Sequence, residues 1–302
     1  MDSAIKLKHK IASADNFIAQ GKYLHAIQLY ERMLVEFPQN QEVYYNLAQL
    51  YELSGNFNSS FNLLSKYLES NPNDVDMQLY YGQLLFKHEE WERAIEVFTK
   101  LVPEEKPLSQ YFLGHAYLMI RDLEMSRISF LSFISLDADR ELVFEAFVRL
   151  AKIELEMKDF EQALKYAKQS EIFFSSNWEL YFIYANCYLQ LGMDAHAITA
   201  IEKAIKLNPQ PSELYELAGK IYLRTGDNTR AESNFKKYIE LNESVSSETY
   251  SQLADACFKA KKIDSALDYY ELALKIDPGN KSALMGVQNI HRNKKSSVSK
   301  DA

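Results

Sequence analysis

The stretch WELYFIYANCYLQLGMDAHAITAIEKAIKLNPQP, residues 178–211, contains a pattern that recurs along most of the chain. A small residue, Ala185, is followed three positions later by a large one, Tyr188, and a second small residue, Ala197, stands twelve positions after the first. Eight copies follow one another at intervals of 32 to 37 residues, and the fifth copy has Glu154 at the large position. Their first small residues are Ala14, Ala48, Gly82, Gly114, Ala151, Ala185, Gly219 and Ala254. A fixed period of this length indicates a repeat protein.

Each copy is predicted to form two antiparallel helices. Apolar side chains recur at helical spacing, as in Leu47, Leu50 and Tyr51. The second set of small residues consists of Ala26, Ser60, Ala94, Ser126, Ala163, Ala197, Ala231 and Ala266. Glycines that suit a turn with positive φ between the two helices are Gly21, Gly55, Gly192 and Gly226. The small residues allow two helices to approach closely, and stacking of eight pairs buries a core that one pair cannot bury alone.

Composition agrees with long helices and excludes several classes of function. The 302 residues include only 9 Gly and 7 Pro, so sharp connections are few. The net charge of −8 argues against a large nucleic-acid-binding surface. The only two cysteines, Cys187 and Cys257, exclude a disulfide framework and favour a reducing compartment, and both fall at or near packing positions.

Neither a membrane span nor a catalytic motif is visible in the sequence. No run approaches 18 apolar residues, and residues 1–17 lack the apolar segment of a signal peptide, so a cytoplasmic monomer without membrane insertion is expected. The six histidines are scattered, and there is no glycine-rich phosphate loop, no HExxH motif and no GxSxG motif. We therefore expect no enzyme, no cofactor and no metal site.

The pattern of small and large residues in units of about 34 residues, with proline near the end, closely resembles the tetratricopeptide repeat (TPR) family over roughly residues 7–278. The resemblance implies an all-α fold, a right-handed α-solenoid of about eight TPR helix pairs in which the first helices line the concave face. The implied repeats are approximately 7–40, 41–74, 75–106, 107–142, 143–177, 178–211, 212–246 and 247–280.

Two departures from the regular pattern have structural consequences. The third unit is shortened around Pro103 and Pro107 and the fourth is lengthened, which predicts irregular curvature and a hinge between two halves near residues 102–142. Apolar residues on one stripe of 281–293 predict a C-terminal capping helix, so that 1–293 form a single solenoid. Residues 294–302 have no apolar period and are expected to be a disordered tail.

On the geometry of the family, the first helices present a set of side chains to the concave groove. The predicted partner-binding residues are Tyr45, Asn46, Gln49, Tyr80, Gln83, Phe86, Tyr111, Phe112, His115, Arg149, Lys152, Phe182, Asn186, Lys220 and Arg224. The first half is aromatic with neighbouring amides, which suits a peptide segment, and the second half is basic, which suits acidic side chains or a C-terminal carboxylate. The alternative is that the aromatic rings only pack against the neighbouring repeat.

Acidic residues stand near the start of six first helices, namely Glu42, Asp76, Glu145, Glu179, Glu213 and Glu248. A row of carboxylates that faces a groove recruits basic ligands, whereas the simpler interpretation is that each carboxylate complements the positive end of its own helix. The clamp of the family's chaperone-tail adaptors is matched here at only one of five positions, Asn46, which argues against that binding mode.

These observations predict a non-catalytic interaction scaffold, or adaptor, whose concave face binds a peptide segment of another protein. The site is expected to centre on Tyr111, Phe112 and His115, because two consecutive aromatic residues lie about 100° apart on a helix and one must therefore face outward or into the groove. The alternative is a structural assembly factor that uses its convex face or its edges within a multiprotein complex.

Overall fold

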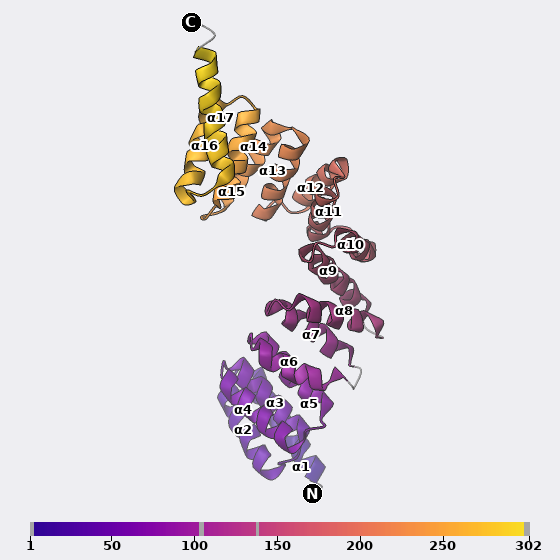
Figure 1. Ribbon diagram of the computed structural model, residues 1–302. Helices are drawn as coiled ribbons and strands as arrows, with labels where there is room; N and C mark the ends of the chain where they lie inside the picture. The colour runs from indigo at the N-terminus through magenta and orange to yellow at the C-terminus, as the bar shows by residue number, and fades with distance from the viewer. Residues whose placement is uncertain (1–2, 103–105, 137–138, 299–302) are drawn as a thin grey trace. The chain divides into compact units, whose positions relative to one another are not determined.

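The computed structural model describes residues 3–102, 106–136 and 139–298, and every regular element within these ranges is a helix (Figure 1). The helices are α1 (Ser3–Ala19), α2 (Tyr23–Glu36), α3 (Gln41–Leu53), α4 (Phe57–Ser70), α5 (Val75–Lys87), α6 (Trp91–Lys100), α7 (Pro107–Met119), α8 (Leu123–Ser135), α9 (Arg140–Glu156), α10 (Phe160–Phe174), α11 (Trp178–Gln190), α12 (Asp194–Leu207), α13 (Ser212–Thr225), α14 (Asn228–Leu241), α15 (Ser247–Lys259), α16 (Ile263–Ile276) and α17 (Lys281–Val298). Among the described helices, none is both long and apolar enough to cross a membrane.

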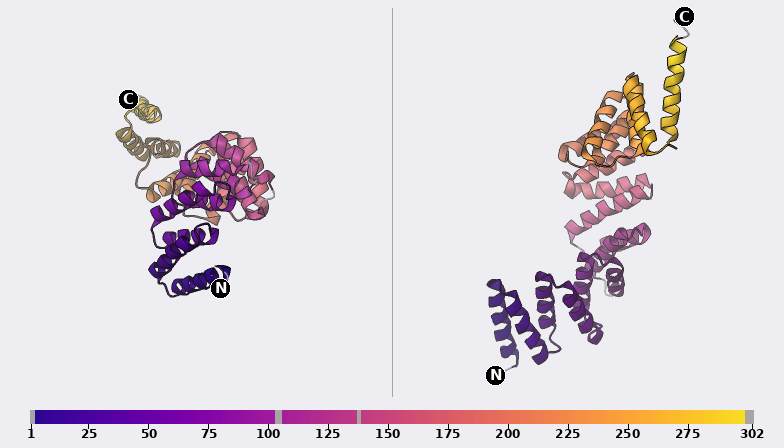
Figure 2. Two further views of the ribbon diagram at one scale, coloured as in Figure 1. Left: turned by 90° about the horizontal axis from the view of Figure 1, so that it is seen from below. Right: turned by 90° about the vertical axis from the view of Figure 1, so that its left-hand side faces the viewer.

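The chain divides into two compact units, which we call the N-terminal unit (Met1–Asp139) and the C-terminal unit (Arg140–Ala302). Within each unit, the two helices of a pair pack against each other, and the second helix packs against the first helix of the next pair in that unit, as the stacked ribbons of Figure 2 show. The predicted α-solenoid of helix pairs is thereby confirmed. The division falls inside segment 102–142, and the altered curvature expected there stays a prediction.

Small residues stand where the two helices of a pair cross, as predicted. The ring of Phe98 on α6 lies so close to Gly82 on α5 that a Cβ at the glycine would be 2.6 Å from Phe98 Cε1. Equivalent contacts join Gly114 to Phe130 and Gly219 to Phe235. The alanines of the second set are fully buried. The close approach of the backbones therefore requires small residues, and an aromatic ring fills the space that they leave.

Serine replaces alanine in two pairs without leaving a polar group unsatisfied. The buried Ser60 hydroxyl donates to the Ala48 carbonyl at 3.0 Å, and the buried Ser126 hydroxyl donates to the Gly114 carbonyl at 2.6 Å. Both hydrogen bonds join the first small residue of a unit to the second. The departure at Ser126 is thus accommodated by a bond between the two helices rather than by a change in packing.

The turn inside each unit contains one residue in the left-handed region. Gly21, Gly55, Gly192 and Gly226 have φ between 70° and 85°, as predicted. In the other four units the same position carries a residue with a side chain and φ between 61° and 66°, namely Glu89, Arg121, Lys158 and Lys261. The repeat geometry therefore imposes this conformation even where glycine is absent.

Two helix boundaries differ from the sequence prediction. Helix α9 begins at Arg140, because residues 140–142 continue the amphipathic pattern without a glycine or proline to stop it. Helix α17 continues to Val298, since the lysine and serine residues after 293 do not terminate a helix. It therefore includes residues 294–298, which the sequence places in a disordered tail. The rest of that tail, 299–302, and Pro103 lie outside the described residues, whereas Pro107 is the first residue of α7.

Candidate partner-binding surfaces

We call the surface formed by the first helices α3, α5 and α7 the first-helix face of the N-terminal unit. It presents a pair of tyrosines from neighbouring repeats. Tyr45 on α3 and Tyr80 on α5 have ring centroids 4.6 Å apart, and 38% of Tyr45 is exposed. Tyr80 is partly buried, and its hydroxyl makes no hydrogen bond within the described part of the chain. Burial and the nearby charge of Glu52 raise the pKa of Tyr80. The two rings form an apolar surface that solvent reaches at Tyr45.

A hollow of about 260 Å³ lies beside this pair, and we call it the α3–α5 hollow. Its lining residues are Gln41, Glu42, Tyr45, Asp76 and Met77. Glu42 is exposed, and the Asp76 side chain is 81% exposed with Lys106 Nζ 3.8 Å from its carboxylate. Two carboxylates, an aromatic ring and a thioether therefore meet in one depression. The sequence interpretation that acidic residues face a groove applies to these two, both of which also lie in the first turn of their helices.

The neighbouring amides are half-buried rather than fully presented to solvent. Gln49, Gln83 and Asn46 are partly buried, and Asn46 lies near the hydroxyl of the buried Tyr30. Burial raises the pKa of Tyr30 to about 12, and the amide of Asn46 opposes that shift. Asn46 therefore lies where α3 meets α2, and its role in partner binding stays a prediction.

Tyr111 and Phe112 of the predicted aromatic site pack against two different second helices. The ring of Phe112 stacks on Phe98 of α6, with centroids 5.4 Å apart and an angle of 8° between the planes. The ring of Tyr111 lies 5.3 Å from that of Phe133 on α8. Because the two side chains lie about 100° apart, each contacts a different second helix and neither is forced outward. Both side chains also stay partly exposed, so neither lies fully in the core, and the part of either ring in the groove stays a prediction.

His115 and Phe86 belong to the same cluster. The His115 ring lies 4.6 Å from Tyr111 and 5.0 Å from Phe130, both approximately edge to face. Phe86 lies 5.2 Å from Phe112, again close to edge to face. These distances are those of favourable aromatic pairs inside proteins. The cluster thus joins α5, α6, α7 and α8, and its binding role stays a prediction.

The predicted basic residues of the C-terminal unit are all paired with carboxylates of the same unit. Arg149 contacts Glu145 at 3.2 Å, Lys152 contacts Glu179 at 2.9 Å and Lys220 contacts Glu216 at 2.6 Å, while Arg224 contacts Asp194 and the carbonyl of Leu189. Their charge is thus largely compensated. The remaining predicted residues, Phe182 and Asn186, are partly buried on α11. Glu145 does not stand near the start of a helix, because α9 begins at Arg140.

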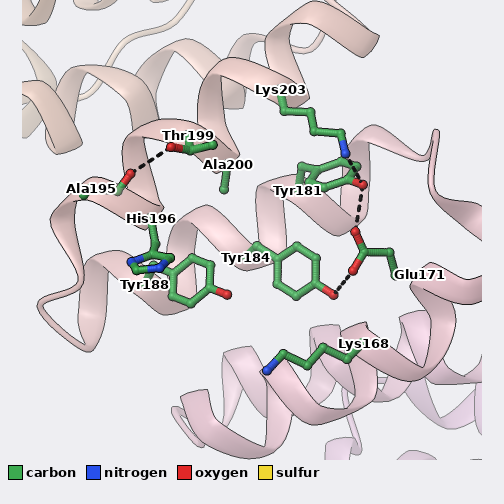
Figure 3. Close-up of a pocket in the computed structure, with 10 residues that line it drawn as sticks. All are labelled: Lys168, Glu171, Tyr181, Tyr184, Tyr188, Ala195, His196, Thr199, Ala200 and Lys203. Atoms are coloured by element: carbon green, nitrogen blue, oxygen red, sulfur yellow. Dashed lines mark hydrogen bonds between the residues drawn. The ribbon is translucent and has the colours of Figure 1, made fainter.

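A hollow that sequence analysis did not identify lies between α10, α11 and α12 (Figure 3). It measures about 400 Å³ and is lined by Lys168, Glu171, Tyr181, Tyr184, Tyr188, Ala195, His196, Thr199, Ala200 and Lys203. Because it includes the second helices of two successive pairs, it lies on the side of the unit away from the first-helix face. We call it the three-tyrosine hollow.

Glu171 organises two of the three tyrosines. Its carboxylate oxygens lie 2.9 Å from the hydroxyls of Tyr181 and Tyr184, which are each only 5% exposed. Lys203 Nζ donates to the Tyr181 hydroxyl at 2.5 Å and lies 3.9 Å from the centroid of that ring. Burial, the bond to Glu171 and its charge raise the pKa of Tyr184. The spacing of the tyrosines at i, i+3 and i+7 in the sequence was the available signal, but the repeat itself demands large residues on this helix.

The two cysteines and the possible metal ligands add no further site in the residues that the structure describes. Cys187 and Cys257 are free and buried, as predicted, and burial raises their pKa values to about 12 and about 11. In the part of the chain that the structure describes, no group of three or more His, Cys, Asp and Glu residues is placed to hold a metal ion.

Family models match three predicted repeats one by one, and one further model spans the second repeat with parts of the first and third. Three tetratricopeptide repeat models match residues 178–211, 212–245 and 247–280, and the model described as anaphase-promoting complex, cyclosome, subunit 3 matches residues 19–101. Together with the helix pairs on α1–α16, these matches identify the class of protein. The chain belongs to the tetratricopeptide repeat family.

Relatives with known names are similar over different parts of the chain. Heat shock protein STI1 of Saccharomyces cerevisiae is 34% identical over 88 residues, which cover 29% of this chain and 15% of that protein. Human superkiller complex protein 3 is 24% identical over 323 residues, which cover 96% of this chain and 20% of that protein. DnaJ homolog subfamily C member 3 of Bos taurus is 21% identical over 279 residues, which cover 87% of this chain and 50% of that protein. The chain thus spans half or less of the length of these relatives.

Solved structures are similar in fold. The Cut9 and Hcn1 hetero-tetramer of the anaphase-promoting complex gives a TM-score of 0.58 at 15% identity, covering 93% of this chain and 55% of that one. A tetratricopeptide repeat protein of Parabacteroides merdae gives a TM-score of 0.53 at 19% identity, covering 82% of this chain and 98% of that one. YrrB, whose structure is described as having an unusual peptide-binding site, gives a TM-score of 0.53 at 17% identity. The match covers 64% of this chain and 99% of that one. At these identities the likeness concerns the fold alone.

Proposed function

We propose that the chain is a non-catalytic scaffold for protein–protein contacts, and that a segment of a partner binds on the first-helix face of the N-terminal unit. The observation that carries this proposal is the α3–α5 hollow, where an exposed ring and two carboxylates lie in one depression. An exposed aromatic residue beside a concave site is a strong anchor for a partner.

The chemistry of the hollow selects a basic segment. The carboxylates of Glu42 and Asp76 attract a lysine or arginine of the partner, and the ring of Tyr45 receives either the cationic head or its aliphatic stem. Lys106 already lies near Asp76, but the exposed pair is weak and a bidentate arginine can displace it. Tyr80, Gln49 and Gln83 would continue the contact along the face.

The other predicted groove residues enter the proposal with a smaller role. Phe86, Tyr111, Phe112 and His115 add apolar contact only through their exposed edges, because their rings also pack within the unit. Arg149, Lys152, Lys220 and Arg224 would meet an acidic group only by exchanging an existing ion-pair partner. This exchange reduces the gain in affinity.

The second candidate is a structural role within a multiprotein assembly, in which the opposite side of the repeats is used. The three-tyrosine hollow on that side supports this candidate. So do the matches to a subunit model of the anaphase-promoting complex and to the fold of Cut9 with Hcn1, which belong to multisubunit complexes. Both candidates make the chain a protein-binding scaffold, and they differ in the face that is used.

A photo-crosslinking amino acid placed at position 45 tests the choice of face. We expect it to capture a partner in cells, whereas the same residue at the exposed position of Glu92 on α6 should not. The double variant Glu42→Lys/Asp76→Lys should abolish the crosslink, and Glu92→Lys/Glu96→Lys, which makes the same charge change on a second helix, should leave it. Capture at position 92 with none at position 45 would replace this proposal by the assembly role.

We also propose that the protein is a cytoplasmic monomer. Its two free buried cysteines support the reducing compartment. Imaging of a tagged chain in its own cells and light scattering of the purified protein test the two parts separately. A secreted or dimeric protein would contradict them.

A further inference from the structure

We propose that the three-tyrosine hollow is a second protein-binding site, and that it takes a partner segment in which an aromatic or large apolar side chain stands next to an aspartate or glutamate. The site lies on α10, α11 and α12 and shares no residue with the first-helix face of the N-terminal unit. It therefore goes beyond the binding proposed for the α3–α5 hollow and fails or succeeds independently of it. Shape and charge support the assignment, and an equivalent hollow in the N-terminal unit shows which of its features the fold alone requires.

The shape suits one inserted side chain. At about 400 Å³ the hollow is in the size range of binding pockets rather than of packing defects. The rings of Tyr184 and Tyr188 are nearly parallel, with centroids 6.1 Å apart and an angle of 19° between the planes, and they form one continuous apolar wall. His196 extends this wall at 5.2 Å from Tyr188. Against such a wall an aromatic ring gains both buried area and favourable edge or offset contacts.

One hydroxyl on this wall is available to a ligand. Tyr181 and Tyr184 direct their hydroxyls to Glu171, but the hydroxyl of Tyr188 makes no hydrogen bond with any described residue. In Figure 3 the ring of Tyr188 lies beside His196 and its hydroxyl points along the wall toward Tyr184. A polar group that follows an inserted ring can therefore bond to Tyr188 without breaking an internal contact.

The charges favour an acidic neighbour for that ring. The lining contains two lysines and one carboxylate, although the protein as a whole carries a net charge of −8. Both oxygens of Glu171 are engaged by tyrosine hydroxyls. Lys168 is exposed on α10 and forms no ion pair with the described residues, so it is the cation that a partner carboxylate can reach (Figure 3).

A cationic segment is disfavoured by the same contacts. Three tyrosines with a carboxylate would ordinarily suit an ammonium group. Here Lys203 of the chain itself lies over the ring of Tyr181 at 3.9 Å and so occupies that place. A second cation would meet the charges of Lys203 and Lys168 on the two sides of the hollow.

A hollow at the same repeat positions in the N-terminal unit shows what the fold alone requires. It measures about 480 Å³ between α4, α5 and α6, and Tyr81 and Lys100 stand at the repeat positions of Tyr184 and Lys203. The positions of Lys168 and Glu171 are there filled by Ser65 and Leu68. The depression thus comes with the repeat, whereas the combination of Tyr181, Glu171 and Lys168 is peculiar to α10–α12.

The test uses a displayed library of short random peptides, selected in parallel on the full chain and on variants. We expect the wild-type protein to enrich peptides with Phe, Tyr, Trp or Leu next to Asp or Glu. Lys168→Glu should lose these peptides, while Lys165→Glu, an exposed lysine one turn earlier on α10 that does not line the hollow, should keep them. Tyr188→Phe, which retains the ring, separates loss of the hydroxyl from loss of folding.

Affinities of one selected peptide, measured by fluorescence anisotropy, complete the test. We expect a loss of about tenfold for Lys168→Glu, a smaller loss for Tyr188→Phe and no change for Lys165→Glu or for Glu42→Lys/Asp76→Lys. Replacing the acidic residue of the peptide by lysine should weaken binding to a similar extent. Enrichment of basic peptides, the same peptides on wild type and Lys168→Glu, or no enrichment on wild type would each overturn the proposal.

Discussion

The ring of Phe98 lies directly over Gly82, so that a Cβ added at the glycine would stand 2.6 Å from Phe98 Cε1. Phe98 is completely buried and cannot swing away. Gly82→Ala should therefore lower the free energy of unfolding by about 1–3 kcal/mol, even though alanine favours the helix by about 1 kcal/mol over glycine. Urea denaturation measures this change.

The same contact provides its own control. In the double variant Gly82→Ala/Phe98→Leu the smaller side chain removes the clash, so the loss should be less than the sum of the two single losses. Additive losses would show that the glycine is not required by the ring.

A second glycine tests the backbone rather than the packing. Gly192 has a φ of 74°, and a Cβ there would have no atom within 4 Å. Gly192→Ala should lower stability by about 1 kcal/mol, solely because a residue with a side chain is disfavoured in this region. The converse change, Lys261→Gly at a φ of 65°, should relieve that strain and lower stability less than Gly192→Ala does, or raise it. Equal losses for both variants would exclude the backbone explanation.

The fold was predictable because every determining contact is local to one repeat or to the next. The small residues at positions such as Ala185 and Ala197, and the turn glycines, recur with the period itself, so eight weak signals support one interpretation. The end of α17 was not predictable, since no residue after Ile290 forbids or demands a helix.

The candidate sites were less predictable for a physical reason. The period states which helix a residue belongs to, but the direction of a side chain on a partly exposed face depends on its neighbours. The rings of Tyr111 and Phe112 contact two different second helices, and Lys152 forms an ion pair with Glu179 of the next repeat. The three-tyrosine hollow is formed by three helices together. Its charged residues, Lys168, Glu171 and Lys203, lie on two different helices, so no local sequence pattern indicates that they meet.

Removal of α17 should cause self-association. Tyr270 is 1% exposed and its ring packs so closely on Gly286 of α17 that a Cβ there would overlap it. A chain that ends at Pro278 exposes Ala266 and Tyr270, and an apolar repeat end in solvent associates with another copy. Light scattering should show a rise in mass with concentration, whereas a chain that ends at Val298 should behave as wild type. A truncated chain that stays monomeric would contradict the capping role.

Stability should depend on pH through Asp255. Burial raises the pKa of this carboxyl above its ordinary value of 3.8, and the hydrogen bond from Tyr270 only partly opposes that shift. A raised pKa means that the folded state favours the protonated acid, so this contribution to stability is complete below 3.8 and is lost as the pH rises through the raised value. Asp255→Asn should therefore raise the melting temperature at pH 7 and flatten its pH dependence. Asp268→Asn, an exposed site on α16, should do neither.

Tyrosines on the first-helix face should separate binding from stability. Tyr111 packs on Phe133 and lies 4.6 Å from His115, so Tyr111→Ala/His115→Ala should lower the free energy of unfolding by about 2 kcal/mol or more along with any loss of partner. Tyr45 is 38% exposed and packs on Tyr80, so Tyr45→Ala should lower the free energy of unfolding less than the Tyr111 variant does and should still abolish binding of the partner that the crosslink identifies. Thermal unfolding and pull-down of that partner are measured on the same preparations. If Tyr45→Ala keeps wild-type binding while the Tyr111 variant loses it at a temperature where both are folded, the site centres on α7 rather than on α3 and α5.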